Sequence, residues 1–466
     1  MSMADEDLWD GYGLLKKLNQ HPLGIFNLNP IQSAMALNSP INSHQHIFKL
    51  NGFICIQVDC KRNGDRQMSN KVVIIGCGRT PFGEHYEKDP EELIEQAGLK
   101  ALESAGIERK DLDAAMISNY FLQLTNKIGL EEGFLSEILD LHIPIETARS
   151  FNSAVNYACN AIEAGKYKIV LVGGIEKMND RLDKIRDDIM MLMDSWSYYA
   201  GGSMEAHHEL MLREYIKKHG LRGSDLEGLM KALAYISHKN HEYGSKNQDA
   251  QFYRVKVDVE TVIKARAGKI LGLYDYAPIS DGATAIILAS EEKAREIGVK
   301  RGVSILGRGV ATDYLSYPSR EDLAGFKSTR IAARKAMEEA KVGIERIKLM
   351  ELYDQSTLME LIALEDIGVY SPGTAWKAII EGMENKRYTY KAGESEIYAN
   401  TNGGLKADGN PYGATGGAQI IEIYLQLMGK AGDRQIPIGD GDYALNVEHE
   451  GFGTKTYVNI FGRWEW

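Results

Sequence analysis

Hydrophobic and polar positions show two kinds of spacing along most of the chain, one typical of strands and the other typical of helices. Residues 71–76, Lys-Val-Val-Ile-Ile-Gly, form an apolar run that is typical of a buried strand. Residues 91–105 place apolar side chains at helical spacing, and Gly106 follows as a helix stop. The same alternation predicts strands at 112–117 and 169–172 and an apolar helix at 150–164. Strands interleaved with helices predict βα units, a mostly parallel sheet and therefore an α/β fold.

The chain also contains a weak internal repeat. Residues 101–107, Ala-Leu-Glu-Ser-Ala-Gly-Ile, resemble residues 336–342, Ala-Met-Glu-Glu-Ala-Lys-Val. Each stretch follows an apolar strand, near Val72 and Val303, and precedes another strand. The identities are few, so the repeat by itself predicts only that the chain has two similar halves.

Two regions interrupt this alternation. Residues 1–67 are rich in Asn, Ser, His and Gln and carry one candidate strand at 53–58. We interpret them as an appended N-terminal tail, with Met68 as the natural start; the alternative is an accessory segment that packs on a partner. Residues 179–268 lack a βα pattern. The predicted organisation is therefore an N-terminal half at 68–299, with a loop domain inserted at about 179–268, and a C-terminal half at 300–466.

The inserted region begins with a stretch rich in methionine and aromatic residues, namely Met190, Met191, Met193, Trp196, Tyr198 and Tyr199. The simpler interpretation is packing within a helix core or loop. A functional interpretation is an adaptable apolar lining for an acyl group, because methionine adapts to irregular shapes. A third is a surface that contacts a partner protein.

Composition narrows the classes of function. Hydrophobic residues make up 44% and charged residues 26%, as in an ordinary globular protein, and the net charge of −11 argues against nucleic-acid binding. The four cysteines, with no Cys-x-x-Cys pair, predict neither a disulfide framework nor a structural metal site, and they favour a reducing, cytoplasmic location. No apolar run is long enough to span a membrane, and the acidic N-terminus differs from a signal peptide.

Several segments resemble the thiolase superfamily, especially its archaeal and sterol-carrier type. The most specific lies in residues 402–416, where the family reads Gly-His-Pro-x-Gly-Ala-Thr-Gly and this chain reads Gly-Asn-Pro-Tyr-Gly-Ala-Thr-Gly. The others are Gly-Cys-Gly-Arg-Thr-Pro-Phe-Gly at 76–83, the strand at 168–178 and Pro-Ile-Ser-Asp-Gly-Ala-Thr-Ala at 278–285. The resemblance covers residues 71–463. It implies two similar βα halves in a five-layer αβαβα arrangement, a dimeric core and acyl-CoA as ligand or substrate.

The chemistry of the resembled family depends on three side chains. A cysteine at the start of a buried helix forms the acyl-enzyme, one histidine activates it, and a second histidine holds the thioester oxygen. The corresponding positions here are Ala148, Tyr353 and Asn410. In a glycine-rich segment near the C-terminus, His449 is a candidate acid or base. Ser150 lies near the nucleophile position, but the sequence shows no motif that would give it a base.

These substitutions lead to four hypotheses. The first is a catalytically silent or non-classical subunit of a thiolase-like acyltransferase complex, which keeps the dimer fold and CoA binding. The second is a lyase that cleaves a β-hydroxyacyl-CoA by a retro-aldol reaction. Thiolase-fold aldolases also carry a tyrosine at the position of Tyr353 and work with a zinc-ribbon/OB-fold partner, and Arg149 is the candidate cation that would lower the pKa of that tyrosine. The third is an ordinary acetyl-CoA acyltransferase, if the alignment at Ala148 is wrong. The fourth is an interaction module that does not bind CoA.

Overall fold

The computed structural model describes residues 45–50, 53–58 and 71–466. Strands β1 (Gln45–Leu50) and β2 (Phe53–Val58) form an antiparallel hairpin, which we describe by itself. The second strand confirms the candidate strand at 53–58. Met68, the expected natural start, lies outside the described residues. The tail interpretation of residues 1–67 stays a prediction.

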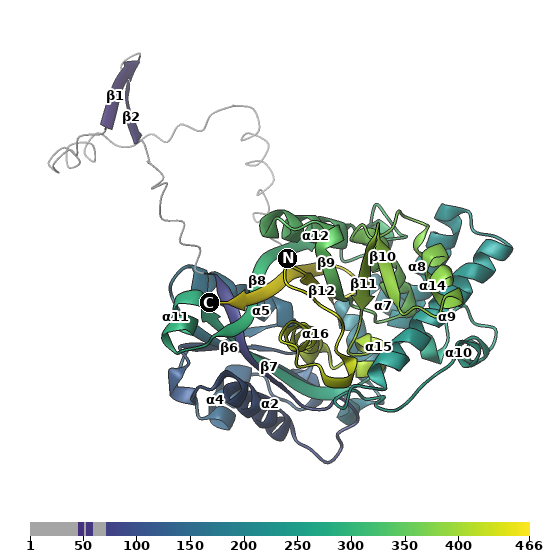
Figure 1. Cartoon of the computed structure of the whole chain (residues 1–466), viewed down its shortest axis with the longest axis horizontal. Coiled ribbons are helices and arrows are strands. Elements are labelled where there is room, and N and C mark those ends of the chain that lie inside the picture. Colours follow the sequence, from purple (N-terminus) through teal and green to yellow (C-terminus); the bar gives the residue numbers. More distant parts are fainter. Residues whose placement is uncertain (1–44, 51–52, 59–70) are drawn as a thin grey trace, which may run out of the picture. The chain divides into compact units, whose positions relative to one another are not determined.

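The N-terminal half forms one end of a mixed sheet with the strand order β3-β7-β6-β4-β5, of which β6 and β7 are labelled in Figure 1. Its strands are β3 (Val72–Arg79), β4 (Ala114–Ser118), β5 (Ile145–Ala148), β6 (Ile169–Lys177) and β7 (Asp281–Ser290). Its outer face is covered by α2 (Pro90–Ala105), α4 (Glu131–Leu139) and α11 (Glu291–Glu296), and α3 (Leu122–Thr125) follows β4. The helix expected at 91–105 and the strands expected near 112–117 and 169–172 are confirmed.

The C-terminal half continues the same sheet, because its first strand pairs with β3. Its strands are β8 (Arg301–Thr312), β9 (Ile347–Glu351), β10 (Thr389–Ala392), β11 (Ser395–Ala399), β12 (Tyr443–Glu450) and β13 (Lys455–Glu465). Helices α12 (Lys327–Ala340) and α13 (Thr357–Asp366) lie on its outer side, with α14 (Ala375–Glu384) beyond. The internal repeat falls on the ends of α2 and α12, where Gly106 and Lys341 both adopt left-handed backbone angles.

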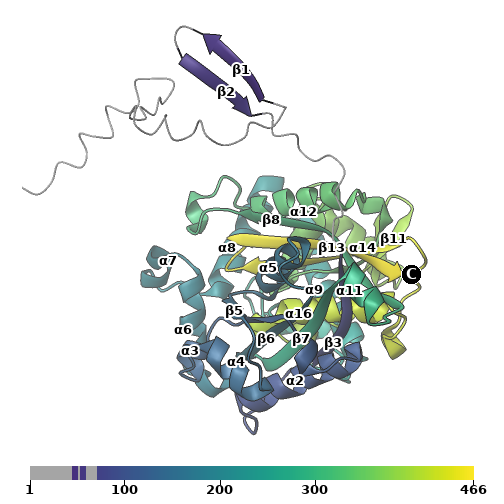
Figure 2. The same ribbon diagram turned by 90° about the vertical axis from the view of Figure 1, so that its left-hand side faces the viewer.

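Two helices form the middle layer of the described core. They are α5 (Phe151–Glu163) and α16 (Tyr412–Leu427), and they lie between the strands of the two halves (Figure 2). Ala154 of α5 and Ile420 of α16 share one buried cluster with Ile286 of the first half and Leu349 of the second. The result is the expected α/β arrangement of helix, sheet, helix, sheet and helix layers.

The expectation of a mostly parallel sheet is wrong. β4 pairs in parallel with β5 and β6, and β9 pairs in parallel with β11 and β12. The six other ladders of the sheet are antiparallel. Hydrophobic periodicity identifies a strand but not its direction. The turn at 451–454 is so short that β12 and β13 can pair only as an antiparallel hairpin.

The region at 179–268 is helical in all its regular elements. It contains α6 (Ile185–Ile189), α7 (Ser195–Tyr199), α8 (Met204–His219), α9 (Ser224–Gly244) and α10 (Val259–Ala265). Helix α9 packs against α14 and α15 (Gly404–Asp408). No helix in the described ranges is both long and apolar enough to cross a membrane.

Candidate functional site

The position expected for the nucleophile lies at the end of an edge strand. Ala148 is the last residue of β5 and is nearly buried, at 7% exposed. Helix α5 begins three residues later, and Ser150 is its N-cap. The Ser150 hydroxyl oxygen accepts a hydrogen bond from the amide of Ser153 at 3.3 Å and donates to Glu450 at 2.8 Å. Ser150 therefore has a carboxylate partner that the sequence did not reveal, but a carboxylate is a weak base for a serine hydroxyl.

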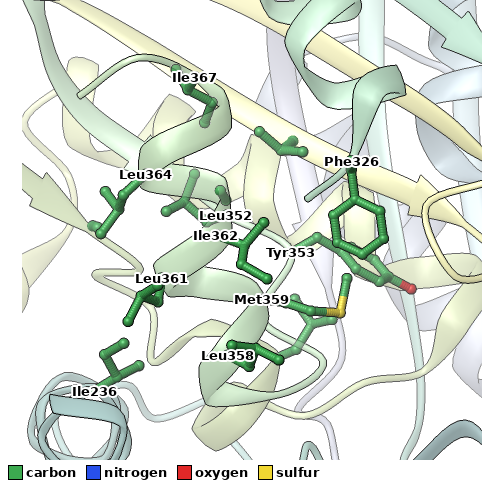
Figure 3. Packing of buried hydrophobic residues seen from close by; sticks show 14 of the residues in the cluster. Ile236, Phe326, Leu352, Tyr353, Leu358, Met359, Leu361, Ile362, Leu364 and Ile367 are labelled. Atoms are coloured by element: carbon green, nitrogen blue, oxygen red, sulfur yellow. The ribbon is translucent and has the colours of Figure 1, made fainter. Parts of the chain in front are cut away.

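Tyr353 lies in the loop between β9 and α13 and is buried. Its ring packs beside Phe326 and Met359, and its hydroxyl lies at the edge of that cluster (Figure 3). Burial, with Tyr412 and Glu448 nearby, raises the pKa of Tyr353 well above its usual value. The lowered pKa that a tyrosine base would require is therefore not found. Tyr353 stays protonated and can donate a hydrogen bond.

The candidate cation, Arg149, and the candidate acid or base, His449, leave Tyr353 protonated. Arg149 is exposed, and the largest influences on the pKa of Tyr353 are burial and the neighbouring Tyr412 and Glu448. The ring of His449, on β12, stacks against Tyr353 with the ring centroids 5.5 Å apart. Its Nε2 lies 3.2 Å from the hydroxyl of Thr329, and its Nδ1 has no partner among the described residues. Burial lowers the pKa of His449 to about 3, so the ring is neutral near pH 7.

Asn410 stands just before α16 and is buried. Its backbone amide donates to the Ser280 hydroxyl at 2.8 Å, and its side-chain oxygen accepts from the Thr415 hydroxyl at 2.9 Å. Because the side-chain oxygen is occupied, the amide Nδ2 is the group that can serve a ligand. Asn410 lines a small cavity of about 40 Å³ together with Gln355 and Tyr412.

This cavity adjoins a much wider groove of about 850 Å³. The two share Arg186, Glu205 and the segment 276–279. A groove of this size is in the range of small-molecule and cofactor sites. Asn410 lines only the small cavity, and neither the cavity nor the groove is lined by Tyr353, His449 or Ala148. The structure thus brings Tyr353 and His449 together, and it places Asn410 apart from them, in the small cavity that adjoins the groove.

Two buried carboxyl groups were missed by the sequence analysis. Glu448 accepts a hydrogen bond from the amide of Asn152 at 2.7 Å, while its Oε1 has no partner among the described residues. Burial raises the pKa of Glu448 to about 8. Glu176 accepts from the amides of Tyr120 and Phe121 at 3.0 Å each, and burial raises its pKa to about 8 as well. Glu448 and Glu450 stand two residues apart in a strand that also carries Asn446 and His449, so the sequence around Glu448 gave no sign of its burial.

The methionine-rich stretch is partly buried and partly exposed. Met190 and Met193 are buried in the large core cluster, as the simpler interpretation expected. Met191, Trp196 and Tyr199 are exposed and lie away from the groove lining. Together with neighbouring residues, Met191 and Tyr199 border a separate surface hollow of about 470 Å³.

Comparisons with known proteins agree with this geometry. Residues 72–257 match the family model "Thiolase, N-terminal domain", and residues 309–463 match "Thiolase C-terminal domain-like". An acetyl-CoA acetyltransferase of Methanothermobacter thermautotrophicus is 32% identical over 84% of this chain and 99% of its own length. The benzoylsuccinyl-CoA thiolase subunit BbsB of Thauera aromatica is 26% identical over 82% of this chain and 98% of its own length.

A solved structure described as "Ltp2-ChsH2(DUF35) aldolase" has the same fold. Its TM-score is 0.69 at 18% sequence identity, and the match covers 84% of this chain and 98% of that chain. The layered fold, the matches to both thiolase domain models and the 32% identity to an acetyl-CoA acetyltransferase lead to one conclusion: this chain belongs to the thiolase superfamily.

Proposed function

We propose that this protein is an acyl-CoA-binding subunit of a thiolase-like complex and that it forms no acyl-enzyme itself. The observation that carries the proposal is the absence of a free nucleophilic side chain just before α5. Ala148 has no nucleophilic atom, and the Ser150 hydroxyl is engaged as a helix cap and with Glu450. Tyr353 and Ala148 line neither the cavity nor the groove, so of the three family positions only Asn410 is open to a ligand that enters through the groove.

The groove is the proposed acyl-CoA site. Its volume suits a cofactor-sized ligand, and the small cavity that adjoins it presents the Asn410 amide as a donor for a thioester oxygen. Lys269 is exposed at its margin, where it can contact the anionic part of CoA in spite of the negative net charge of the protein.

The proposed partners are a second copy of the chain and a separate subunit. β5 is the last strand at one end of the described sheet, and its Glu146 and Thr147 side chains are exposed, so that edge is free to pair with another strand. For the separate subunit, we propose a thiolase-like or zinc-ribbon/OB-fold protein. One relative is named as a thiolase subunit, and the name of the solved aldolase joins two components.

Titration calorimetry with CoA and acetoacetyl-CoA, followed by assays with and without the candidate partner, tests this function. We expect binding of CoA thioesters by the isolated protein, no thiolysis and no acetylated protein. Thiolysis of acetoacetyl-CoA by the isolated protein would overturn the proposal. Failure to bind any CoA thioester would also overturn it and would favour the non-CoA interaction module.

A second function, retro-aldol cleavage of a β-hydroxyacyl-CoA, is favoured by one observation. Glu448 combines a buried position, a free carboxyl oxygen and a pKa near 8, which suits a general base better than Tyr353 does. The base would take the β-hydroxyl proton, the Cα–Cβ bond would break to release a carbonyl compound, and Asn410 would donate to the enolate oxygen of the remaining thioester until Cα is protonated.

This reaction requires the cavity to open further, because Glu448 and Tyr353 do not line it. The decisive assay is aldehyde or ketone release from a β-hydroxyacyl-CoA by the native protein and by Glu448→Gln and Tyr353→Phe. Cleavage that Glu448→Gln abolishes would replace the silent-subunit proposal. Absence of cleavage with every tested partner would remove the lyase.

A further inference from the structure

Lys406 is a buried cation in the wall of the groove. It lies on α15, is 3% exposed and lines the groove about 850 Å³ in volume. Its ammonium nitrogen Nζ is 5.7 Å from the ring centroid of Phe252 and 6.0 Å from that of Tyr274. Aromatic faces stabilise a cation but leave its hydrogen-bonding capacity unused.

The described part of the protein supplies no hydrogen-bond acceptor or ion-pair partner for Nζ of Lys406. The nearest acidic groups that influence it are Asp354 and Asp275. Asp275 is held by two hydrogen bonds of 2.8 Å from Arg266. Asp354 accepts from the side chain of Asn240 at 2.7 Å and from the backbone of α15. Buried charges are ordinarily paired, so this ammonium is an exception that calls for an explanation.

His241 adds a second group without partners in the same place. It is 1% exposed, and neither of its ring nitrogens has a hydrogen-bond partner among the described residues. Its ring lies 5.3 Å from that of Phe252. Burial and the Lys406 charge lower the pKa of His241 to about 3, so the ring is neutral. Burial lowers the pKa of Lys406 to about 8, which leaves the ammonium mostly protonated at pH 7.

We propose that Lys406 binds a carboxylate carried by the acyl part of the CoA thioester, so that the ligand is the monothioester of a dicarboxylic acid. The inference rests on the proposed function, because it takes the groove as the CoA-thioester site. One unpaired positive charge between two aromatic rings matches a single negative charge. A phosphate or diphosphate brings more negative charge than this position can neutralise.

Two thioesters of equal chain length isolate the effect of the carboxylate. Calorimetric titration of the whole protein should show that glutaryl-CoA binds at least about tenfold more tightly than pentanoyl-CoA, as expected for a charge-assisted hydrogen bond in a partly dry site. Lys406→Met should abolish this preference by lowering the affinity for glutaryl-CoA to that for pentanoyl-CoA, and Lys406→Arg should retain most of the preference. Lys269→Met, at the exposed margin of the same groove, is the control: it should lower both affinities by a similar factor and keep the preference.

The other outcomes distinguish a failure of the carboxylate inference from a failure of the proposed function. Equal affinity of the native protein for the two thioesters would overturn the carboxylate inference and leave the proposed function intact. An equal loss of both affinities in Lys406→Met, with Lys406→Arg unaffected, would assign the ammonium to the CoA part and overturn it too. If the native protein bound neither thioester, the proposed function would fail together with this inference. Circular dichroism of each variant checks that it is folded.

Discussion

The rings of Tyr353 and His449 stack at a centroid distance of 5.5 Å, with their planes inclined by 21°. Both groups are neutral, since burial raises the pKa of the phenol and lowers that of the imidazole. A neutral pair can hydrogen-bond to a ligand oxygen, but it cannot supply the strong base that activates a thiol. The position of the family's first histidine therefore holds a tyrosine that can donate a hydrogen bond but cannot act as a strong base.

Restoring the missing side chains should restore part of the lost chemistry. We expect Ala148→Cys alone to remain unacetylated by acetyl-CoA, because Glu450 bonds to nearby Ser150 and neither position 353 nor position 410 holds a histidine that would lower the thiol pKa. The triple variant Ala148→Cys, Tyr353→His, Asn410→His should acquire an acetyl group, as detected by mass spectrometry of the intact protein. Acetylation of Arg149→Cys in place of Ala148→Cys would show that the alignment of the nucleophile position is wrong by one residue.

Asn410→Asp tests the donor at the inner end of the cavity. Aspartate keeps an oxygen for the Thr415 hydroxyl but replaces the amide donor with a second acceptor. We expect affinity for CoA thioesters to fall by about tenfold or more, and the buried carboxyl group should also lower the melting temperature. Asn410→Ala, which removes both groups, should also lose stability. Unchanged binding by Asn410→Asp would mean that the amide does not face the ligand.

Glu448→Gln should change the pH dependence of stability. Burial raises the pKa of Glu448 from 4.5 to about 8 in the folded protein, so the native state keeps a proton that the unfolded chain releases. The native stability therefore falls as the pH rises from about 4.5 to about 8. Because glutamine cannot ionise, the variant should gain stability relative to the native protein across this window, by at most about 5 kcal/mol.

Urea unfolding at pH 5, 6.5 and 8 measures this difference. The exposed residue Glu146 provides the control, since Glu146→Gln should stay within about 0.5 kcal/mol of the native protein at each pH. Parallel stability curves for the native protein and Glu448→Gln would show that the buried carboxyl ionises at its ordinary pKa.

Gly309→Ala should strongly destabilise the fold. A Cβ at this position of β8 would lie 1.8 Å from the backbone oxygen of Ala332 on α12, where neither backbone can move freely. We expect a loss of at least about 3 kcal/mol in the free energy of unfolding. Gly133→Ala is the matched control: it lies within α4, and its Cβ would meet only an ordinary contact at 3.8 Å. That variant should gain about 0.5–1 kcal/mol.

The sequence predicted those features that depend on local spacing. The apolar positions of α2 and its stop at Gly106 are visible in the chain, and so is the start of the buried helix at Ser150. Strand direction was not predictable in the same way, because β12 and β13 are antiparallel through a turn whose geometry periodicity does not record.

The candidate site was predictable only where a motif marked it. Motif alignment selected Tyr353 and Asn410, and the structure places them as a buried loop residue and a cavity-lining residue. The environment of a carboxylate is a tertiary property, so neither the burial of Glu448 nor its free oxygen could be inferred from its neighbours in sequence. The unpaired state of Lys406 was hidden for the same reason, since it depends on which donors already occupy Asp275 and Asp354.

The middle layer joins the two halves through one shared cluster of buried apolar side chains. Helices α5 and α16 bury their apolar faces against strands from both halves, so either half expressed alone would expose this surface to water. Neither half is expected to fold independently, even though each matches its own family model. A gene fragment that encodes one half would therefore yield an aggregation-prone polypeptide.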